Sequence, residues 1–229
     1  MAGQLELLFA KPVMTFNNLL NEKDYNFANS WLKQHFEKNA VEPEESTDGG
    51  PLYPEKGHGK YKTTVTVSTH AWDPNLQDNP QFEIFNKAIL DCCKEFADTM
   101  GYSKCSDYLF IKDMWAFIGK ENTHIQQHVH GHSFISGAYY FEVPQGTKLI
   151  FRDYTNMHRV PDTYNKVNST QRAFDSKQNQ LVLFRSDIPH GTSPQPAGID
   201  KLCVSFNVHF KPEAIFTTPV EFDKLLGAK

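Results

Sequence analysis

The sequence has few cysteines, and none of them stands in a metal-binding or disulfide pattern. Four occur in the 229 residues, and no two form a Cys-x-x-Cys pair. Cys92 and Cys93 are adjacent in a run with helical spacing, where they make a poor disulfide framework. We therefore expect reduced thiols in a cytoplasmic protein.

Long apolar runs and an excess of positive charge are also missing. No segment approaches the roughly 18 uninterrupted apolar residues of a membrane span, and residues 1–16 lack the features of a signal peptide. The formal net charge of −4 does not favour nucleic acid as a partner, although it leaves a local basic groove open. A glycine-rich phosphate loop and a Gly-x-Ser-x-Gly motif are absent as well. We expect a soluble protein without a membrane partner.

Aromatic residues, by contrast, are plentiful. The 18 Phe and 9 Tyr supply a core that a disordered chain would lack. From residue 107 onward, short β-rich runs follow one another between Gly, Pro, Asn and Asp residues. They read YLFIKDMWAFIG, SFISGAYYFEV, TKLIFRDY, QLVLFRS and KLCVSFNVHF. This order predicts a mainly β sandwich or barrel rather than alternating strands and helices.

The first half of the chain reads differently. Apolar residues at three- and four-residue spacings predict helices over 16–38 and 80–100, and residues 63–70 alternate like a strand. Polar segments at 40–60 and 154–179 predict loops. We expect a single domain over residues 1–229. Its parts are a helical cover with the first strands (1–106), a β-core with the active site (107–210) and a C-terminal extension (211–229).

Four of the ten histidines crowd into one short segment, at positions 124, 128, 130 and 132. Residues two apart in a strand point to the same side, so His128, His130 and His132 would project from one face. That spacing suits a metal site with two ligands from one strand. A single histidine is more often a surface or hydrogen-bonded residue, so the cluster alone favours a metal only slightly.

A second feature strengthens the metal interpretation. An apolar strand leads through a turn to His190, and the next strand opens with Lys201. A histidine followed by a cation on the neighbouring strand suits a site that holds both a metal and a dicarboxylate. On its own, Lys201 would be taken for a solvated charge.

The order of these motifs resembles the 2-oxoglutarate/Fe(II)-dependent oxygenases. The similar stretches are His128-x-His130, SGAYYFEVPQGTKLIF, LVLFRSDIPHG and KLCVSFN, over roughly residues 107–210. The pattern is similar to a bacterial and phage group with an HxH…SGxYY…H…RxSxxFN-like signature. The resemblance implies a double-stranded β-helix (jelly roll) with flanking helices, and Fe(II) and 2-oxoglutarate as cofactors. It also implies O2 as co-substrate, and oxidation of an unidentified substrate while 2-oxoglutarate is decarboxylated to succinate.

The resemblance also assigns roles to individual residues. His128 matches the first metal ligand and His190 the distal one. Lys201 matches the residue that binds the far carboxylate of 2-oxoglutarate, and Tyr140 matches a tyrosine that donates a hydrogen bond to it. Ser136, on the same strand face as Tyr140, is a further candidate for cofactor binding. Cys203 stands where the family has a serine, so that hydroxyl contact is missing here. Ser205 or Asn207, on the strand face of Lys201, would replace it.

The third metal ligand departs from the family pattern. His130 stands where the family usually has Asp or Glu. Either His130 is itself a ligand, or Asp153 supplies the carboxylate from a neighbouring strand, or water or halide fills the position. Spacing on one strand favours His130, whereas the preference of these sites for one carboxylate favours Asp153.

Two other functions compete with the leading one. A cupin-type dioxygenase with three histidines around iron would need no keto acid, and Lys201 and Tyr140 argue against it. A jelly roll can also be a non-catalytic binding protein, because a fold alone does not determine function. Hydroxylation, desaturation and halogenation, the substrate and the oligomeric state stay open.

Overall fold

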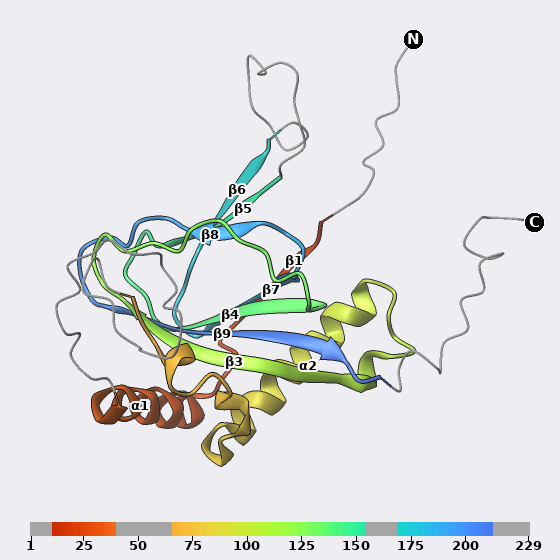
Figure 1. Ribbon diagram of the computed structural model, residues 1–229, viewed down its shortest axis with the longest axis horizontal. Helices are drawn as coiled ribbons and strands as arrows, with labels where there is room; N and C mark the ends of the chain where they lie inside the picture. The colour runs from red at the N-terminus through yellow and green to blue at the C-terminus, as the bar shows by residue number, and fades with distance from the viewer. Residues whose placement is uncertain (1–10, 40–65, 154–168, 213–229) are drawn as a thin grey trace, which may run out of the picture.

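A computed structural model describes residues 11–39, 66–153 and 169–212 (Figure 1). The predicted loop at 40–60 and most of the predicted C-terminal extension lie outside these residues. The two α-helices are α1 (Glu22–Asn39) and α2 (Glu83–Thr99). The strands are β1 (Val13–Asn17), β2 (Thr66–Ser68), β3 (Leu109–Gly119), β4 (Ile135–Glu142), β5 (Lys148–Arg152), β6 (Gln171–Asp175), β7 (Gln180–Arg185), β8 (His190–Thr192) and β9 (Lys201–Phe210).

The strands form two antiparallel sheets. The large sheet has the order β1-β7-β4-β9-β3-β2, and the small sheet has the order β6-β5-β8. Figure 1 shows the small sheet facing one side of the large sheet, while α1 and α2 lie on the other side. The predicted mainly β fold is confirmed, and the arrangement is a double-stranded β-helix flanked by helices.

Alternation along the strands divides the side chains of the large sheet between two faces, each with its own apolar cluster. On β9, Leu202, Val204 and Phe206 pack into the cluster that contains the buried residues of both helices. Cys203, between them, belongs instead to a second cluster with Phe151 of the small sheet. We call this second side the inner face, because it lies between the two sheets. Residues two apart on a strand share a face, so the position of Cys203 places Lys201, Ser205 and Asn207 on the inner face too.

The first helix begins later than the sequence suggested. Residues 13–17 form β1, which pairs with β7, and α1 starts only at Glu22. Asn18 has a φ of 54°, a left-handed conformation that interrupts a helix. The side chain of Asn21 then accepts a hydrogen bond from the Asp24 backbone N–H at 3.0 Å, which caps the helix. The helical prediction for residues 16–21 is therefore wrong, whereas that for 80–100 agrees with α2.

Part of the segment predicted as a loop at 154–179 is a strand, and its residues 154–168 lie outside the described residues. Residues 171–175 form β6, which pairs with β5 along its length. Its sequence QRAFD carries a single large apolar side chain, Phe174, whose ring packs edge-on against Phe151 at 5.5 Å. An exposed edge strand with one apolar contact gives little periodic signal, so the sequence pattern did not reveal it.

Candidate metal centre

Two neighbouring segments carry the three histidines of the site. His190 is the first residue of β8, and His128 pairs with it across an isolated antiparallel bridge. Each of the two donates its backbone N–H to the carbonyl of the other, at 2.9 and 3.0 Å. The backbone N–H of His130 donates to the Ser186 carbonyl at 2.9 Å, which anchors the same segment two residues further on. The predicted strand through 128–132 is therefore wrong: His128 forms an isolated bridge, and a turn at residues 131–132 follows His130, so His132 does not continue the alternation.

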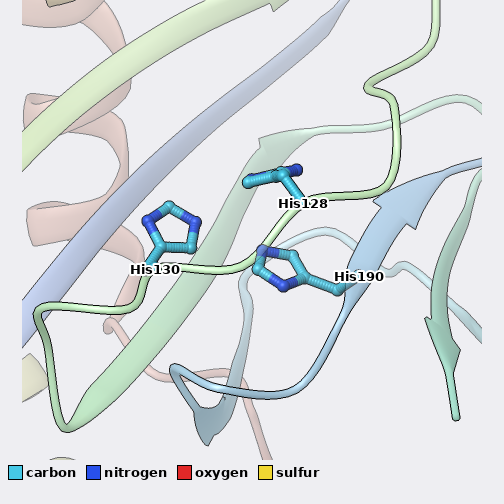
Figure 2. Close-up of side chains that lie close together, drawn as sticks. All are labelled: His128, His130 and His190. Atoms are coloured by element: carbon cyan, nitrogen blue, oxygen red, sulfur yellow. The ribbon is translucent and has the colours of Figure 1, made fainter. Parts of the chain in front are cut away.

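The three imidazole rings face one another (Figure 2). Ring centroids are 4.4 Å apart for His128 and His190, 4.9 Å for His128 and His130, and 5.1 Å for His130 and His190. One ligand nitrogen from each ring lies within 4.8 Å of those from the other two. Among the described residues, these three form the group of His, Cys, Asp or Glu side chains that could hold a metal ion.

Backbone carbonyls determine the tautomers of two of the rings. His128 Nδ1 lies 2.8 Å from the Gln126 carbonyl oxygen, and His190 Nδ1 lies 2.9 Å from that of Ile188. A carbonyl oxygen only accepts hydrogen bonds, so each Nδ1 carries the proton and donates it. The lone pair on each Nε2 is therefore available to a metal, as is typical of metal-binding histidines.

Burial keeps two of the rings neutral. Desolvation lowers the pKa of His130 to about 4, and the nearby His128 lowers it further. Desolvation also lowers the pKa of His190 to about 3, with a second contribution from His128. A metal binds the neutral imidazole, so these side chains are ready to bind without losing a proton at neutral pH.

Asp153, the alternative third ligand, does not join the histidine group. It follows β5 directly, and its carboxylate forms an ion pair with Lys11 at 3.0 Å. The structure thus brings His130, rather than Asp153, together with His128 and His190.

Lys201 lies on the inner face in an apolar environment. The residue is 2% exposed, and its Nζ is 5.0 Å from the centroid of the Phe117 ring. Among the described residues, no side chain forms an ion pair or a hydrogen bond with its ammonium group. Desolvation lowers the pKa of Lys201, and the buried Cys203 opposes this effect. Burial of a cation without a partner is costly, so this position favours an anionic ligand.

Tyr140 lies beside Lys201 on the inner face. It pairs in register with Cys203, two residues along β9 from Lys201, and belongs to the inner-face cluster. Burial raises the pKa of the Tyr140 hydroxyl, and Cys203 adds to this effect, so the hydroxyl stays protonated. It is therefore a hydrogen-bond donor close to the lysine.

The other predicted cofactor-binding residues lie further along the sheet. Ser205 and Asn207 are four and six residues beyond Lys201 on β9, roughly 13 and 20 Å away. Ser136 pairs in register with Asn207 and donates a hydrogen bond to its Oδ1 at 2.7 Å. Ser136 and Asn207 are thus at the end of the inner face away from Lys201, so one carboxylate does not reach all three.

Asp113 and Trp115 were not identified as site residues from the sequence. Asp113 is half-buried on β3 and accepts a hydrogen bond from Asn207 Nδ2 at 2.5 Å. The Trp115 ring stacks on His130 with centroids 6.0 Å apart. A bulge between Ile111 and Asp113 precedes these residues and shifts the register of β3. Alternation within YLFIKDMWAFIG places Asp113 and Trp115 on one face of the strand. The sequence does not show that β9 is the partner strand, so it does not show which residues they meet.

A family model matches residues 113–207, and its description reads "Putative 2OG-Fe(II) oxygenase". The matched segment contains all three histidines of the site and also Lys201. No curated protein matches the chain by sequence. Among the described residues, no helix is both long and apolar enough to cross a membrane.

Several solved structures share the fold. AviO1 from Streptomyces viridochromogenes superposes with a TM-score of 0.56 at 13% identity, covering 91% of this chain and 92% of AviO1. HygX from Streptomyces hygroscopicus, with nickel and 2-oxoglutarate bound, gives 0.54 at 10% identity, with coverage of 88% and 84%. A Trichoplax adhaerens prolyl hydroxylase in complex with a hypoxia inducible factor peptide gives 0.52 at 12% identity, with coverage of 90% and 87%.

These structures support the fold, and the family match goes further because it covers the residues of the site. Over residues 113–207 the chain is thus similar to the putative 2-oxoglutarate/Fe(II)-dependent oxygenases, which are oxidoreductases.

Proposed function

We infer that this oxygenase holds Fe(II) through His128, His130 and His190, and that Lys201 and Tyr140 bind the far carboxylate of 2-oxoglutarate. The reaction we propose is hydroxylation of a substrate that enters beside His130. The observation that carries this assignment is the buried ammonium group of Lys201, which has no anionic partner among the described residues.

The donor set fits the metal. Imidazole nitrogens suit iron as well as zinc, copper and nickel, so the three histidines alone do not select iron. Three ligands from the protein leave further positions for 2-oxoglutarate and O2. His130 is preferred over Asp153 as the third ligand because its ring lies within the group. A centre of three neutral ligands keeps the full charge of the metal, which favours the binding of an anionic keto acid.

The inner face also fits the keto acid. Phe117, which the Lys201 ammonium contacts, belongs to the buried inner-face cluster together with Cys203 and Tyr140. Apolar walls with a cation at the far end suit a short dicarboxylate chain. The ammonium would form an ion pair with the far carboxylate, and Tyr140 would donate a hydrogen bond to the same group.

When bound, Fe(II) and 2-oxoglutarate supply the activation of O2 and the electrons for substrate oxidation. The chain's own residues hold and orient the reactants. The carbonyls of Gln126 and Ile188 keep the Nδ1 protons of His128 and His190 in place, so Nε2 of these two rings would hold the metal. Lys201 sets the direction of the keto acid, and the apolar inner face keeps water from its chain.

The test is an anaerobic titration of the metal-free protein with Fe(II) and 2-oxoglutarate, followed by the weak visible charge-transfer band of the chelated keto acid. We expect the band in the wild-type protein and its loss in His190→Ala. The exposed His124 lies in the same segment outside the metal group, so His124→Ala is the matched control and should keep the band. A band that survives in His190→Ala would refute the assignment.

A three-histidine dioxygenase that needs no keto acid is the second candidate. The absence of a carboxylate from the histidine group among the described residues is the observation in its favour. Iron binding without the charge-transfer band, and turnover without succinate, would support it over the leading proposal.

A further inference from the structure

A directed chain of hydrogen bonds crosses the inner face and ends on Asp113. Asn207 Oδ1 can only accept, so Ser136 donates its proton to it at 2.7 Å. Ser136 then accepts from the Ser186 hydroxyl, at 2.8 Å. Asn207 Nδ2 in turn donates to Asp113 Oδ1, at 2.5 Å. Every donor in the chain points toward Asp113, so the chain suits a carboxylate at its end.

The second oxygen of the Asp113 carboxylate, Oδ2, has no partner among the described residues. Among the described residues, no lysine, arginine or histidine forms an ion pair with Asp113, and its Oδ2 accepts no hydrogen bond. The residue is half-buried, so this oxygen remains open to a ligand. One oxygen of this carboxylate is held by Asn207 and the other is open, so the carboxylate is suited to accept a hydrogen bond from a bound ligand.

Trp115 lies next to Asp113 on the inner face. Two residues along a strand correspond to roughly 7 Å, so a ligand of moderate size reaches both side chains. The indole ring is half-buried and lies between His130 and His70, with centroid distances of 6.0 and 5.5 Å. One neighbour of this ring is thus a residue of the candidate metal centre.

We propose that Asp113 and Trp115 bind a cationic group of the substrate, an ammonium or a guanidinium. The carboxylate attracts the charge, and the face of the indole is the aromatic surface that cations prefer. An apolar group without a hydrogen-bond donor would displace water from Asp113 without replacing its hydrogen bonds, which disfavours apolar substrate groups at this position. As an assignment of substrate class, this proposal rests on the proposed oxygenase function, because the bound group would lie beside the His130 ligand.

The ligands bound in similar solved structures do not show which class of substrate this protein binds. HygX has been crystallised with hygromycin B, and the Trichoplax enzyme with a peptide, on the same fold. Different ligands on one fold mean that side chains such as Asp113 and Trp115 decide selectivity.

The experiment follows the indole Nε1–H signals of the three tryptophans by NMR, in protein loaded with zinc and 2-oxoglutarate. Trp115→Phe identifies the signal of Trp115. The probes are N-acetyl-lysine methylamide and N-acetyl-arginine methylamide, with N-acetyl-norleucine methylamide as the uncharged analogue. At least one cationic probe should shift the Trp115 signal, whereas the uncharged probe should not. In Asp113→Asn we expect the dissociation constant to rise about tenfold, as for loss of a charge-assisted hydrogen bond.

Asp91→Asn is the matched control, because Asp91 is exposed and paired with Lys87 on α2. It should bind the cationic probe as the wild type does. Equal binding of charged and uncharged probes, or unchanged binding in Asp113→Asn, would overturn the proposal. Asp113→Asn should retain the charge-transfer band of Fe(II) and 2-oxoglutarate, and loss of the band would show a structural role instead.

The two proposals fail separately. If the wild-type protein forms no charge-transfer band but Trp115 still responds to the cationic probe, the oxygenase function fails and the cation site stands. If the band forms and no cationic probe binds, the cation site fails alone.

Discussion

Lys201 is unusual because it is buried and has no ionic partner among the described residues. Lys201 contacts the Phe117 ring and the apolar inner face rather than a carboxylate, so the free protein bears the cost of its desolvation. Replacing buried charges by apolar groups of similar volume is often neutral or stabilising. A buried charge at this position is therefore best explained by ligand binding. The lysine would then contribute to function and not to the stability of the fold.

Lys201→Met tests this separation. We expect the free energy of unfolding of the metal-free protein to stay the same or to rise by about 1–3 kcal/mol, because methionine fills the space without a buried charge. The dissociation constant for 2-oxoglutarate should rise by about tenfold or more, since the ionic partner of its carboxylate is lost. Urea denaturation and the charge-transfer titration measure the two quantities.

Lys201→Arg is the conservative control, because it keeps the positive charge and should recover part of the affinity. A strongly destabilised Lys201→Met protein with unchanged affinity would show that the lysine is structural.

At the scale of elements, the candidate metal centre depends on how closely β8 approaches the segment before His128. Gly191 follows His190 directly, and a Cβ on it would lie 2.7 Å from the Ile125 carbonyl oxygen and 3.1 Å from the Gln126 carbonyl carbon. The Thr192 N–H donates to that Ile125 carbonyl at 3.0 Å. The missing side chain of Gly191 thus allows the two histidine-bearing segments to pair.

Gly191→Ala should push the two segments apart. A contact of 2.7 Å with backbone is too short, so the segment that carries His128 and His130 must move. We expect metal affinity to fall by about tenfold or more, the size of effect seen when support around metal ligands is lost. Isothermal titration with a divalent metal measures it.

Gly131 offers a matched control, because nothing lies within 4 Å of a Cβ built on it. Gly131→Ala should therefore bind metal like the wild type. Equal affinities of Gly191→Ala and Gly131→Ala would contradict the role of close packing.

At the scale of the whole molecule, folding without a metal buries the imidazoles of His130 and His190 beside the inner-face cluster. In the folded protein their pKa values are lowered to about 4 and about 3. An unfolded histidine has a pKa of about 6.5, so above that pH both states are neutral and the histidines leave stability unchanged. Below it, the unfolded chain binds protons that the folded chain does not, and the unfolded state gains stability.

The metal-free protein should therefore lose stability as the pH falls from about 6.5 toward about 4. The loss has an upper limit of about 1.4 kcal/mol per pH unit for each of the two histidines. Urea denaturation at pH 7 and pH 5, with a chelator present, measures it. In His190→Asn one titrating group is removed, so the difference between the two pH values should shrink. An equal difference in both proteins would contradict the buried, neutral state of His190.

The sequence by itself determined the nature of the elements and the identity of the candidate residues. The run KLCVSFNVHF alternates an apolar set, which packs into the core beside the helices, with a mainly polar set that includes Lys201 and Asn207, and this pattern is visible without a structure. The stripe of α2 likewise identified buried side chains such as Phe85 and Ile89. Periodicity along the sequence shows which side of an element is buried, so it also predicted the β-rich core. The spacing of the histidines was visible in the same way.

Only the tertiary structure decided what these residues meet. The pairing of β5 with β8 and of His128 with His190 joins positions that are far apart in the chain, and no local pattern encodes it. The same holds for the choice of His130 over Asp153 as the neighbour of the other histidines, and for the chain of hydrogen bonds that ends on Asp113. Contacts of this kind depend on the register between strands, and the bulge in β3 changes that register by backbone geometry rather than by side-chain pattern.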